Sequence, residues 1–233
     1  MGLDFFPVIL TMIDWGDKWL AGSEGPPLLL YHKVCNYIIK PITVCSSCGK
    51  EVKIKDISYK EQTTSGTDYD NASVAMRKFD QSSYRACSVE RFLNLFGDRL
   101  TFLVIRAAFF GVRRFDQFLN EIDIPRSSLI SRLRALVDNG IFKKKLYCQH
   151  PQRFEYGLTQ KGKDLYPFIL ATLRWGDSWL AGKDEPPLLL FHGTCGQIMK
   201  PKMICANCKS EISIRDTRYE NGPGASVNVT QGK

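Results

Sequence analysis

The chain has 233 residues, enough for one or two domains, and 44% of them are hydrophobic, which excludes an intrinsically disordered protein. No apolar run reaches the roughly 18 residues of a membrane span, and the apolar N-terminus lacks the basic flank of a signal peptide. We therefore expect a cytoplasmic protein without a membrane partner. The net charge is +8, and the whole excess lies within residues 77–182, which contain 18 Lys/Arg and 10 Asp/Glu. This local excess of positive charge favours binding to double-stranded DNA, although a basic surface without a partner would have the same charge balance.

Two segments of the chain repeat each other at an offset of 160 residues. The match runs without a gap over residues 2–59 and 162–219, and DFFPVILTMIDWGDKWLAG shares 11 of 19 positions with DLYPFILATLRWGDSWLAG. Such similarity indicates a duplication. The first copy starts at residue 1 without the roughly eighty residues that precede the second copy. A truncation, a misassigned start codon or a decayed gene would each give this pattern, and all three stay open.

The repeat and the composition divide the chain into six predicted parts, and the predicted fold class is α+β. A winged helix-turn-helix domain is expected beside two small β modules that resemble zinc ribbons. The parts are an orphan dimerisation-type helix of a truncated first repeat (1–22), a first zinc-ribbon-like module (23–60), a linker (61–80), the winged helix-turn-helix domain (81–182), a second zinc-ribbon-like module (183–220) and a disordered tail (221–233).

Each copy contains the pattern H-x2-C-x9-C-x2-C, which suits a tetrahedral Cys3His zinc site. The predicted ligands are His32, Cys35, Cys45 and Cys48 in the first copy, and His192, Cys195, Cys205 and Cys208 in the second. A hairpin within each copy would bring its two ligand pairs together, so we expect two sites. A full ligand shell leaves no open position, which predicts a structural zinc ion. Ordinary cysteine-containing hairpins or a disulfide are the alternatives.

The central segment reads as a series of helices followed by a basic hairpin. Residues 88–97 begin with a Ser cap and end at Gly, as a short helix should, and the strongly apolar residues 99–111 predict the buried helix of the core. Residues 114–122 form a short amphipathic helix. In the next helix Leu129, Leu133, Leu136 and Val137 recur at helical spacing and predict the inner face.

The longer helix, at about 125–139, is the predicted recognition helix of the major groove, and the hairpin at about 141–158 is the wing on the backbone or minor groove. The predicted DNA-binding residues are Arg114, Arg126, Ser127, Ser128, Ser131, Arg132, His150, Gln152 and Arg153. Alternatives remain for three of them: Arg132 could be paired inside the domain, Arg114 could contact only phosphate, and His150 could be a plain turn residue. At least one of the three wing lysines at 143–145 must point away from DNA, because side chains alternate along a strand.

Residues 87–180 resemble the HxlR family of winged helix-turn-helix regulators throughout. The matching features are the Cys-x-Val-Glu start at Cys87, Thr101, the Arg114–Phe115 pair, the Leu-x-x-Arg-Leu-x-x-Leu helix at 129–136 and the second wing strand at 153–159. Ser88 and Leu100 stand where the family usually has Pro and Trp. Neither position lies on the expected DNA face.

The resemblance implies a dimeric transcriptional regulator that uses the first and last helices of its domain for dimerisation. The helix at 164–180 agrees, because it carries more apolar surface than one small domain can cover. Its first-copy counterpart, at 4–20, could dock on it within one chain. The expected assembly is therefore a homodimer or an intramolecular pseudo-dimer.

We predict a DNA-binding transcriptional regulator, with repression the expected sign, and no motif of the sequence indicates an enzyme. Some members of the resembled family sense oxidants through a cysteine at the position of Cys87, so this residue is a candidate redox sensor. Its place before a helix favours the thiolate, and a buried inert cysteine is the alternative. The competing functions are a zinc-stabilised protein-interaction scaffold and a thiol-based redox sensor without specific DNA binding.

Overall fold

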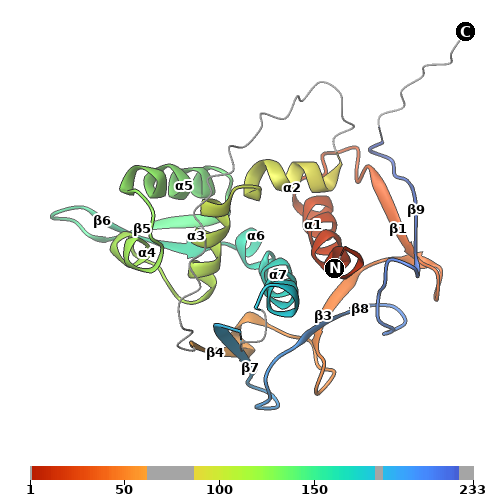
Figure 1. Cartoon of the computed structure of the whole chain (residues 1–233). Helices are drawn as coiled ribbons and strands as arrows, with labels where there is room; N and C mark the ends of the chain where they lie inside the picture. The colour runs from red at the N-terminus through yellow and green to blue at the C-terminus, as the bar shows by residue number, and fades with distance from the viewer. Residues whose placement is uncertain (1, 62–86, 182–185, 226–233) are drawn as a thin grey trace, which may run out of the picture.

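A computed structural model describes residues 2–61, 87–181 and 186–225 of the chain (Figure 1). Most of the predicted linker (61–80) and of the predicted tail (221–233) lies outside these residues. The helices are α1 (Phe6–Trp19), α2 (Ser88–Phe96), α3 (Arg99–Phe109), α4 (Phe115–Glu121), α5 (Arg126–Asp138), α6 (Gln160–Lys163) and α7 (Tyr166–Trp179). The strands are β1 (Leu28–His32), β2 (Tyr37–Ile38), β3 (Pro41–Cys45), β4 (Ile57–Glu61), β5 (Phe142–Cys148), β6 (Arg153–Leu158), β7 (Leu188–His192), β8 (Pro201–Cys205) and β9 (Thr217–Asn221). Among the described helices, none has the length and apolar character that crossing a membrane requires.

The predicted α+β fold is confirmed, and its winged helix-turn-helix part occupies one end of the molecule (Figure 1). The inner face of α5 was predicted from helical spacing, and Leu129, Leu133 and Leu136 are indeed buried there, whereas Val137 is only half-buried. They share one core with Phe118 of α4 and with α3. The antiparallel strands β5 and β6 form the wing that follows this core.

The start of α2 differs from the expectation that Ser88 caps it. The N-cap residue is Cys87, whose Sγ accepts the backbone N–H of Glu90 at 3.4 Å. Ser88 is the first helical residue, and its buried hydroxyl donates to the carboxylate of Asp17 on α1. A serine near the start of a helix can either cap that helix or bond another segment. Here the hydrogen bond to Asp17 determines the position of Ser88.

The strands of the two copies pair with each other, so the expectation of a separate hairpin module in each copy is wrong. Strand β1 pairs with β9, and β4 pairs with β7, which are the same pairing with the copies exchanged. Strand β3 pairs with its own counterpart β8, and Thr43 lies opposite Met203, 160 residues further along the chain. The duplicated segments are therefore related by an approximate two-fold axis between β3 and β8.

Helix α1 lies beside its counterpart α7 in the middle of the molecule, as the docking hypothesis expected (Figure 1). It also packs along α2, the first helix of the winged-helix part. Trp15 of α1 is buried between the rings of Phe92 and Phe96, with centroid distances of 5.6 and 5.1 Å. The first copy thus supplies part of the core of the winged-helix part.

Candidate DNA interface and metal centres

Helix α5 presents a polar face to solvent because its leucines turn the opposite face to the core. Arg126, Ser127 and Ser131 are exposed, and Ser128 is half-buried. Arg126 begins the helix, and its guanidinium lies 4.8 Å from the ring of Phe115 on α4, which orients it at the end of the face. Small hydroxyl side chains beside a cation allow a helix to approach base edges closely.

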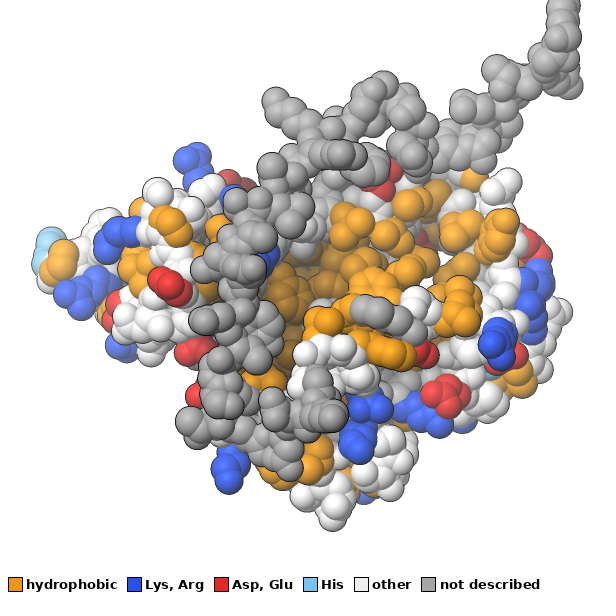
Figure 2. Space-filling model, viewed as in Figure 1, with side chains coloured by type: hydrophobic (Ala, Val, Ile, Leu, Met, Phe, Trp, Pro, Cys, Tyr) orange, Lys and Arg blue, Asp and Glu red, His pale blue; other side chains and the backbone are white. Residues whose placement is uncertain are grey.

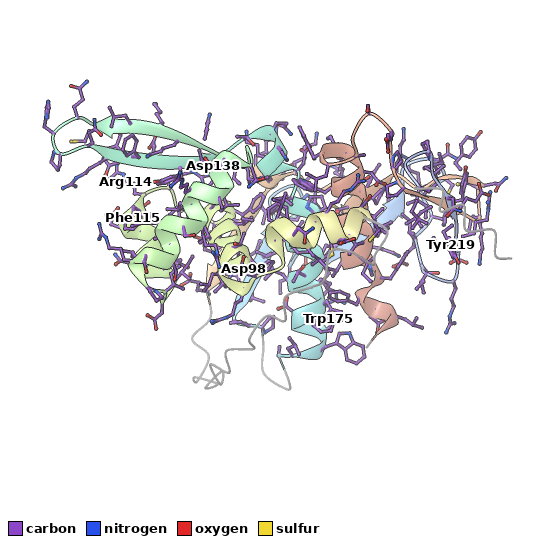
Figure 3. All side chains as sticks on the ribbon, turned by 90° about the horizontal axis from the view of Figure 1, so that it is seen from above. Asp98, Arg114, Phe115, Asp138, Trp175 and Tyr219 are labelled. Carbon is purple, nitrogen blue, oxygen red and sulfur yellow. The ribbon has the colours of Figure 1, made fainter. Side chains whose placement is uncertain are left out.

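The wing contributes a second exposed set beside α5. His150 and Gln152 are exposed in the turn between β5 and β6, and Arg153 is exposed at the first position of β6. Arg114, also exposed, is the N-cap residue of α4, and its guanidinium lies 4.6 Å from the ring of Tyr147 on the wing. Figure 3 places Arg114 and Phe115 at the winged-helix end of the molecule, far from Tyr219 at the other end.

Arg132 has a partner within the domain, which is the alternative that the sequence left open. Its Nε donates to Oδ1 of Asp98 at 3.0 Å, and both side chains are partly buried. Burial raises the pKa of Asp98, but hydrogen bonds from Thr101 and Arg132 outweigh it and hold this pKa below its ordinary value. Arg132 therefore links α5 to the start of α3.

Two sets of exposed cations near this face were not among the predicted DNA-binding residues. Arg134 is one helical turn beyond Ser131, with 83% of its side chain exposed and only a 3.7 Å contact to Asp138. The three wing lysines at 143–145 are all exposed. Helical spacing placed Arg134 on the outer face, and this spacing was the signal that could have included it.

The eight predicted zinc ligands form two clusters, but each cluster takes half of its members from each copy. His32 and Cys35 lie with Cys205 and Cys208, and Cys45 and Cys48 lie with His192 and Cys195. The grouping predicted within each copy is wrong. Strand β3 is extended and spans about 13 Å, so it carries Cys45 away from Cys35. Its antiparallel partner β8 brings Cys205 next to Pro41, near the first pair.

The geometry of both clusters fits a tetrahedral metal ion with Cys3His ligands. The Sγ atoms of Cys35 and Cys205 are 3.9 Å apart, as are those of Cys45 and Cys195. Zinc–sulfur bonds of about 2.3 Å place two sulfurs of a tetrahedron about 3.8 Å apart, whereas a disulfide needs about 2.0 Å. Nδ1 of His32 lies 3.2 Å from Sγ of Cys208. These separations favour a shared ion over a disulfide.

The histidines and a lowered pKa also suit a metal. Both histidines are fully buried, and each has its Nε2 without a hydrogen-bond partner among the described residues, while Nδ1 faces the sulfurs. In the cluster of His32, hydrogen bonding from the backbone N–H of Ser210 lowers the pKa of Cys208 to about 6, while burial raises the pKa of Cys205. A thiolate is the form of cysteine that binds metal.

Cys87 lies outside these clusters. It is exposed, and its Sγ caps α2 by accepting the backbone N–H of Glu90. The buried, inert alternative is thus excluded by its exposure, but its role as a redox sensor stays a prediction.

Comparison with known proteins places this geometry in a family. Residues 95–184 match the model of the HxlR-like helix-turn-helix family. The HTH-type transcriptional regulator Rv3095 of Mycobacterium tuberculosis (strain ATCC 25618 / H37Rv) is 47% identical over 142 residues, which cover 61% of this chain and 90% of that protein. A second HTH-type regulator, sll1512 of Synechocystis sp. (strain ATCC 27184 / PCC 6803 / Kazusa), is 33% identical over 95 residues, covering 40% of this chain and 70% of that protein.

A solved structure agrees with these relatives. The crystal structure of PA1607, described as a candidate transcription factor, has 32% sequence identity and a TM-score of 0.52, covering 59% of this chain and 94% of that one. The resemblance expected from the motifs of the sequence is therefore confirmed. The chain belongs to the HxlR-like helix-turn-helix family and is a DNA-binding transcriptional regulator.

Proposed function

We propose that this chain is a cytoplasmic repressor that recognises one operator half-site with α5 and the wing. Its first copy takes the structural place of a second subunit. The observation that carries the proposal is the exposed face of Arg126, Ser127 and Ser131 beside the exposed wing residue Arg153. Serines let α5 approach base edges, Arg126 supplies a base or phosphate contact, and the wing cations contact the backbone. Arg132 is assigned to positioning α5 through Asp98 instead of contacting DNA.

The pseudo-dimeric arrangement gives each chain a single DNA-binding unit, made of α5 and the wing. The described residues contain one α5 and one wing, while the helix and strands that a dimer would take from a partner come from the first copy. This intramolecular pseudo-dimer explains why α1 is buried against α2 and α7. A single chain should therefore protect one half-site, of about half the length that a two-headed dimer covers.

We further propose that both Cys3His clusters hold structural zinc. Their ligand chemistry and separations support it, and a closed shell of three thiolates and one imidazole favours zinc over a hard cation. When bound, the ion would supply cross-linking and folding free energy rather than reactivity. The residues of both copies would then be held together at two points.

The DNA-binding proposal is tested by selecting bound sequences from random DNA and then measuring the affinity of variants for the selected site. Arg126→Ala should weaken binding by about 1–3 kcal/mol and relax sequence preference. Lys33→Ala, which removes the same charge from the far β1 region, should change affinity by far less. Equal loss in both variants, or no preferred sequence at low ionic strength, would contradict the assigned face.

A further inference from the structure

A large cavity, with a volume of about 1030 Å³, lies between α7, the start of α1 and the region of β8. Part of its lining is apolar, because Phe6, Met203 and Ile212 line it and are all buried. Figure 2 shows hydrophobic side chains gathered over the middle of the molecule, where Figure 1 places α1 and α7. Cavities that bind small molecules usually measure about 300–1,000 Å³, so this space suits a ligand with an apolar body.

Two tryptophans of α7 form one wall of the cavity. The indole of Trp175 packs edge-on against Phe5, with ring centroids 5.1 Å apart, and this contact fixes the indole at the wall. Trp179, one turn later, also lines the cavity and is 44% exposed. Aromatic rings pack favourably edge-to-face or offset against each other, so this wall favours a ligand that is itself aromatic.

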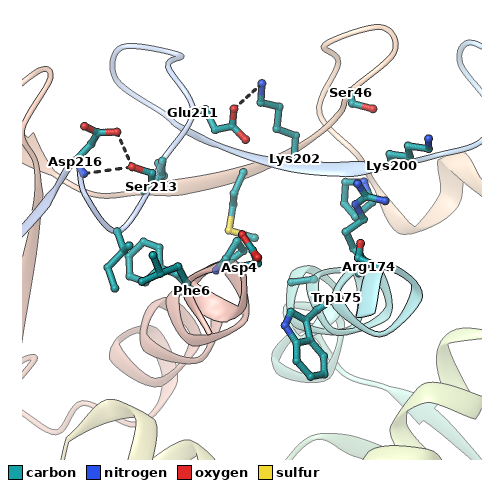
Figure 4. A pocket seen from close by; sticks show the side chains of 18 of the residues that line it. Asp4, Phe6, Ser46, Arg174, Trp175, Lys200, Lys202, Glu211, Ser213 and Asp216 are labelled. Carbon is teal, nitrogen blue, oxygen red and sulfur yellow. Dashed lines mark hydrogen bonds and ion pairs between the residues drawn. The ribbon is translucent and has the colours of Figure 1, made fainter. Parts of the chain in front are cut away.

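Two cations of the lining form no ion pair with any carboxylate among the described residues. They are Arg174 on α7 and Lys200 just before β8, and both are exposed. Figure 4 shows Arg174 extending from α7 toward Lys200. Burial raises the pKa of Asp177, three positions after Arg174, and the charge of Arg174 offsets part of this rise. The two cations therefore give this end of the cavity a positive charge.

The carboxylates of the same lining have other partners or lie on another side. Glu211 binds Lys202 at 2.7 Å, and Asp216 accepts the hydroxyl of Ser213 at 2.6 Å (Figure 4). Asp4 projects from the start of α1, on the side opposite the cations (Figure 4). The positive end of the cavity can therefore receive a negative group from a ligand.

The equivalent surface at the other copy is covered and carries a different charge. Tyr166 is the counterpart of Phe6, and the ring of Phe109 on α3 covers it at a centroid distance of 5.1 Å. The counterpart of Arg174 is Asp14. The positive charge of Arg174 thus occurs only on the side where the space is left open.

We propose that this cavity binds a small aromatic carboxylate, with its carboxylate group between Arg174 and Lys200. A planar guanidinium can donate two parallel hydrogen bonds to a carboxylate, and the lysine adds a second positive charge. The aromatic body would pack against Trp179 and Phe6. Asp177 offsets part of the positive charge, which favours a singly charged carboxylate over a doubly charged phosphate ester. The cavity is separate from α5 and the wing, so the inference goes beyond the proposed function.

The test is isothermal titration calorimetry of the full chain, with zinc present, against 2-naphthoate and its neutral analogue 2-naphthamide. The carboxylate should bind saturably at one site, and the amide at least about tenfold more weakly, because it cannot form charge-assisted hydrogen bonds. Arg174→Gln and Lys200→Gln should each weaken the binding of 2-naphthoate, Arg174→Gln by about tenfold or more. Lys40→Gln, at the position equivalent to Lys200 in the first copy, is the matched control and should leave affinity unchanged.

These substitutions replace exposed side chains, so the variants should unfold at the temperature of the wild type, which a thermal melt checks. Equal affinity for 2-naphthoate and 2-naphthamide, or equal losses in Lys40→Gln and Lys200→Gln, would overturn the proposal. A wild-type chain that shows no saturable binding of 2-naphthoate at millimolar concentration would also overturn it. The assay contains no DNA, so its failure leaves the DNA-binding result unaffected, and the converse also holds.

Discussion

At the scale of single residues, Asp14 of the first copy lowers the stability of the folded chain at neutral pH. Its carboxyl lies among protein atoms that displace water, and this burial, together with repulsion from Asp17 and Asp164, raises its pKa to about 6. The residue is nevertheless exposed to solvent, which weakens this effect. Because the pKa is raised on folding, the favourable contribution is complete below about pH 4 and is lost as pH rises through 6.

We therefore predict that Asp14→Asn stabilises the chain at neutral pH. Solvent exposure reduces the effect to about 1 kcal/mol at pH 7, and the difference from wild type should vanish near pH 4. Urea unfolding of both proteins across this range measures it, with metal release affecting both alike. A difference independent of pH would contradict the raised pKa.

Cys87 allows a second prediction at this scale. Diamide or a quinone, at a dose that releases no zinc, should weaken operator binding by the wild-type chain, because Cys87 is exposed and caps α2. Cys87→Ser should bind DNA normally and lose the response, while Cys148→Ser should keep it. A response that persists in Cys87→Ser would exclude the sensor role.

Residue roles were harder to predict than residue exposure. The spacing of the leucines of α5 identified its buried face, since 3.6-residue periodicity depends only on nearby sequence. The same pattern could not show that Arg132 reaches Asp98, 34 positions earlier, or that Ser88 bonds α1 instead of capping its own helix. Those partners come from distant segments that local patterns do not encode.

At the scale of elements, the repeated helices provide a matched pair of glycines. Gly16→Ala should destabilise the chain by about 1–3 kcal/mol, because the added methyl group meets the backbone of Ser88. Gly176→Ala, in open space, should be neutral or stabilise by up to about 1 kcal/mol through helix propensity. Thermal unfolding of the two variants gives the comparison, and similar shifts would argue against the α1–α2 contact.

The helices and the wing were predictable, but the pairing of strands between copies was not. Each element has a strong local signal, such as the Gln149–Gln152 turn between two strand-like runs. Both copies, however, contain equivalent strands and equivalent metal ligands, so the sequence is equally compatible with strand pairing within a copy and between copies. Only the extended path of β3, which separates Cys35 from Cys45, distinguishes the two arrangements.

At the scale of the whole molecule, the shared clusters predict an unusual pattern of zinc loss. Cys45→Ser with Cys195→Ser removes two ligands of one cluster, so one of the two zinc ions should remain. Cys35→Ser with Cys45→Ser removes a ligand from each cluster, so both sites should weaken. Zinc content after dialysis against a moderate chelator measures this, and the opposite ranking would restore the grouping within copies.

The exchange of ligands also changes what a break in the backbone would do. If a protease site were inserted into residues 62–86 and cleaved, each fragment would keep two half-sets of ligands, and neither could coordinate a metal fully without the other. The nicked protein should therefore migrate as one particle, and chelation should weaken an association that the burial of Trp15 against α2 also supports. The metal ions would then add to the packing and strand pairing that keep the two fragments together.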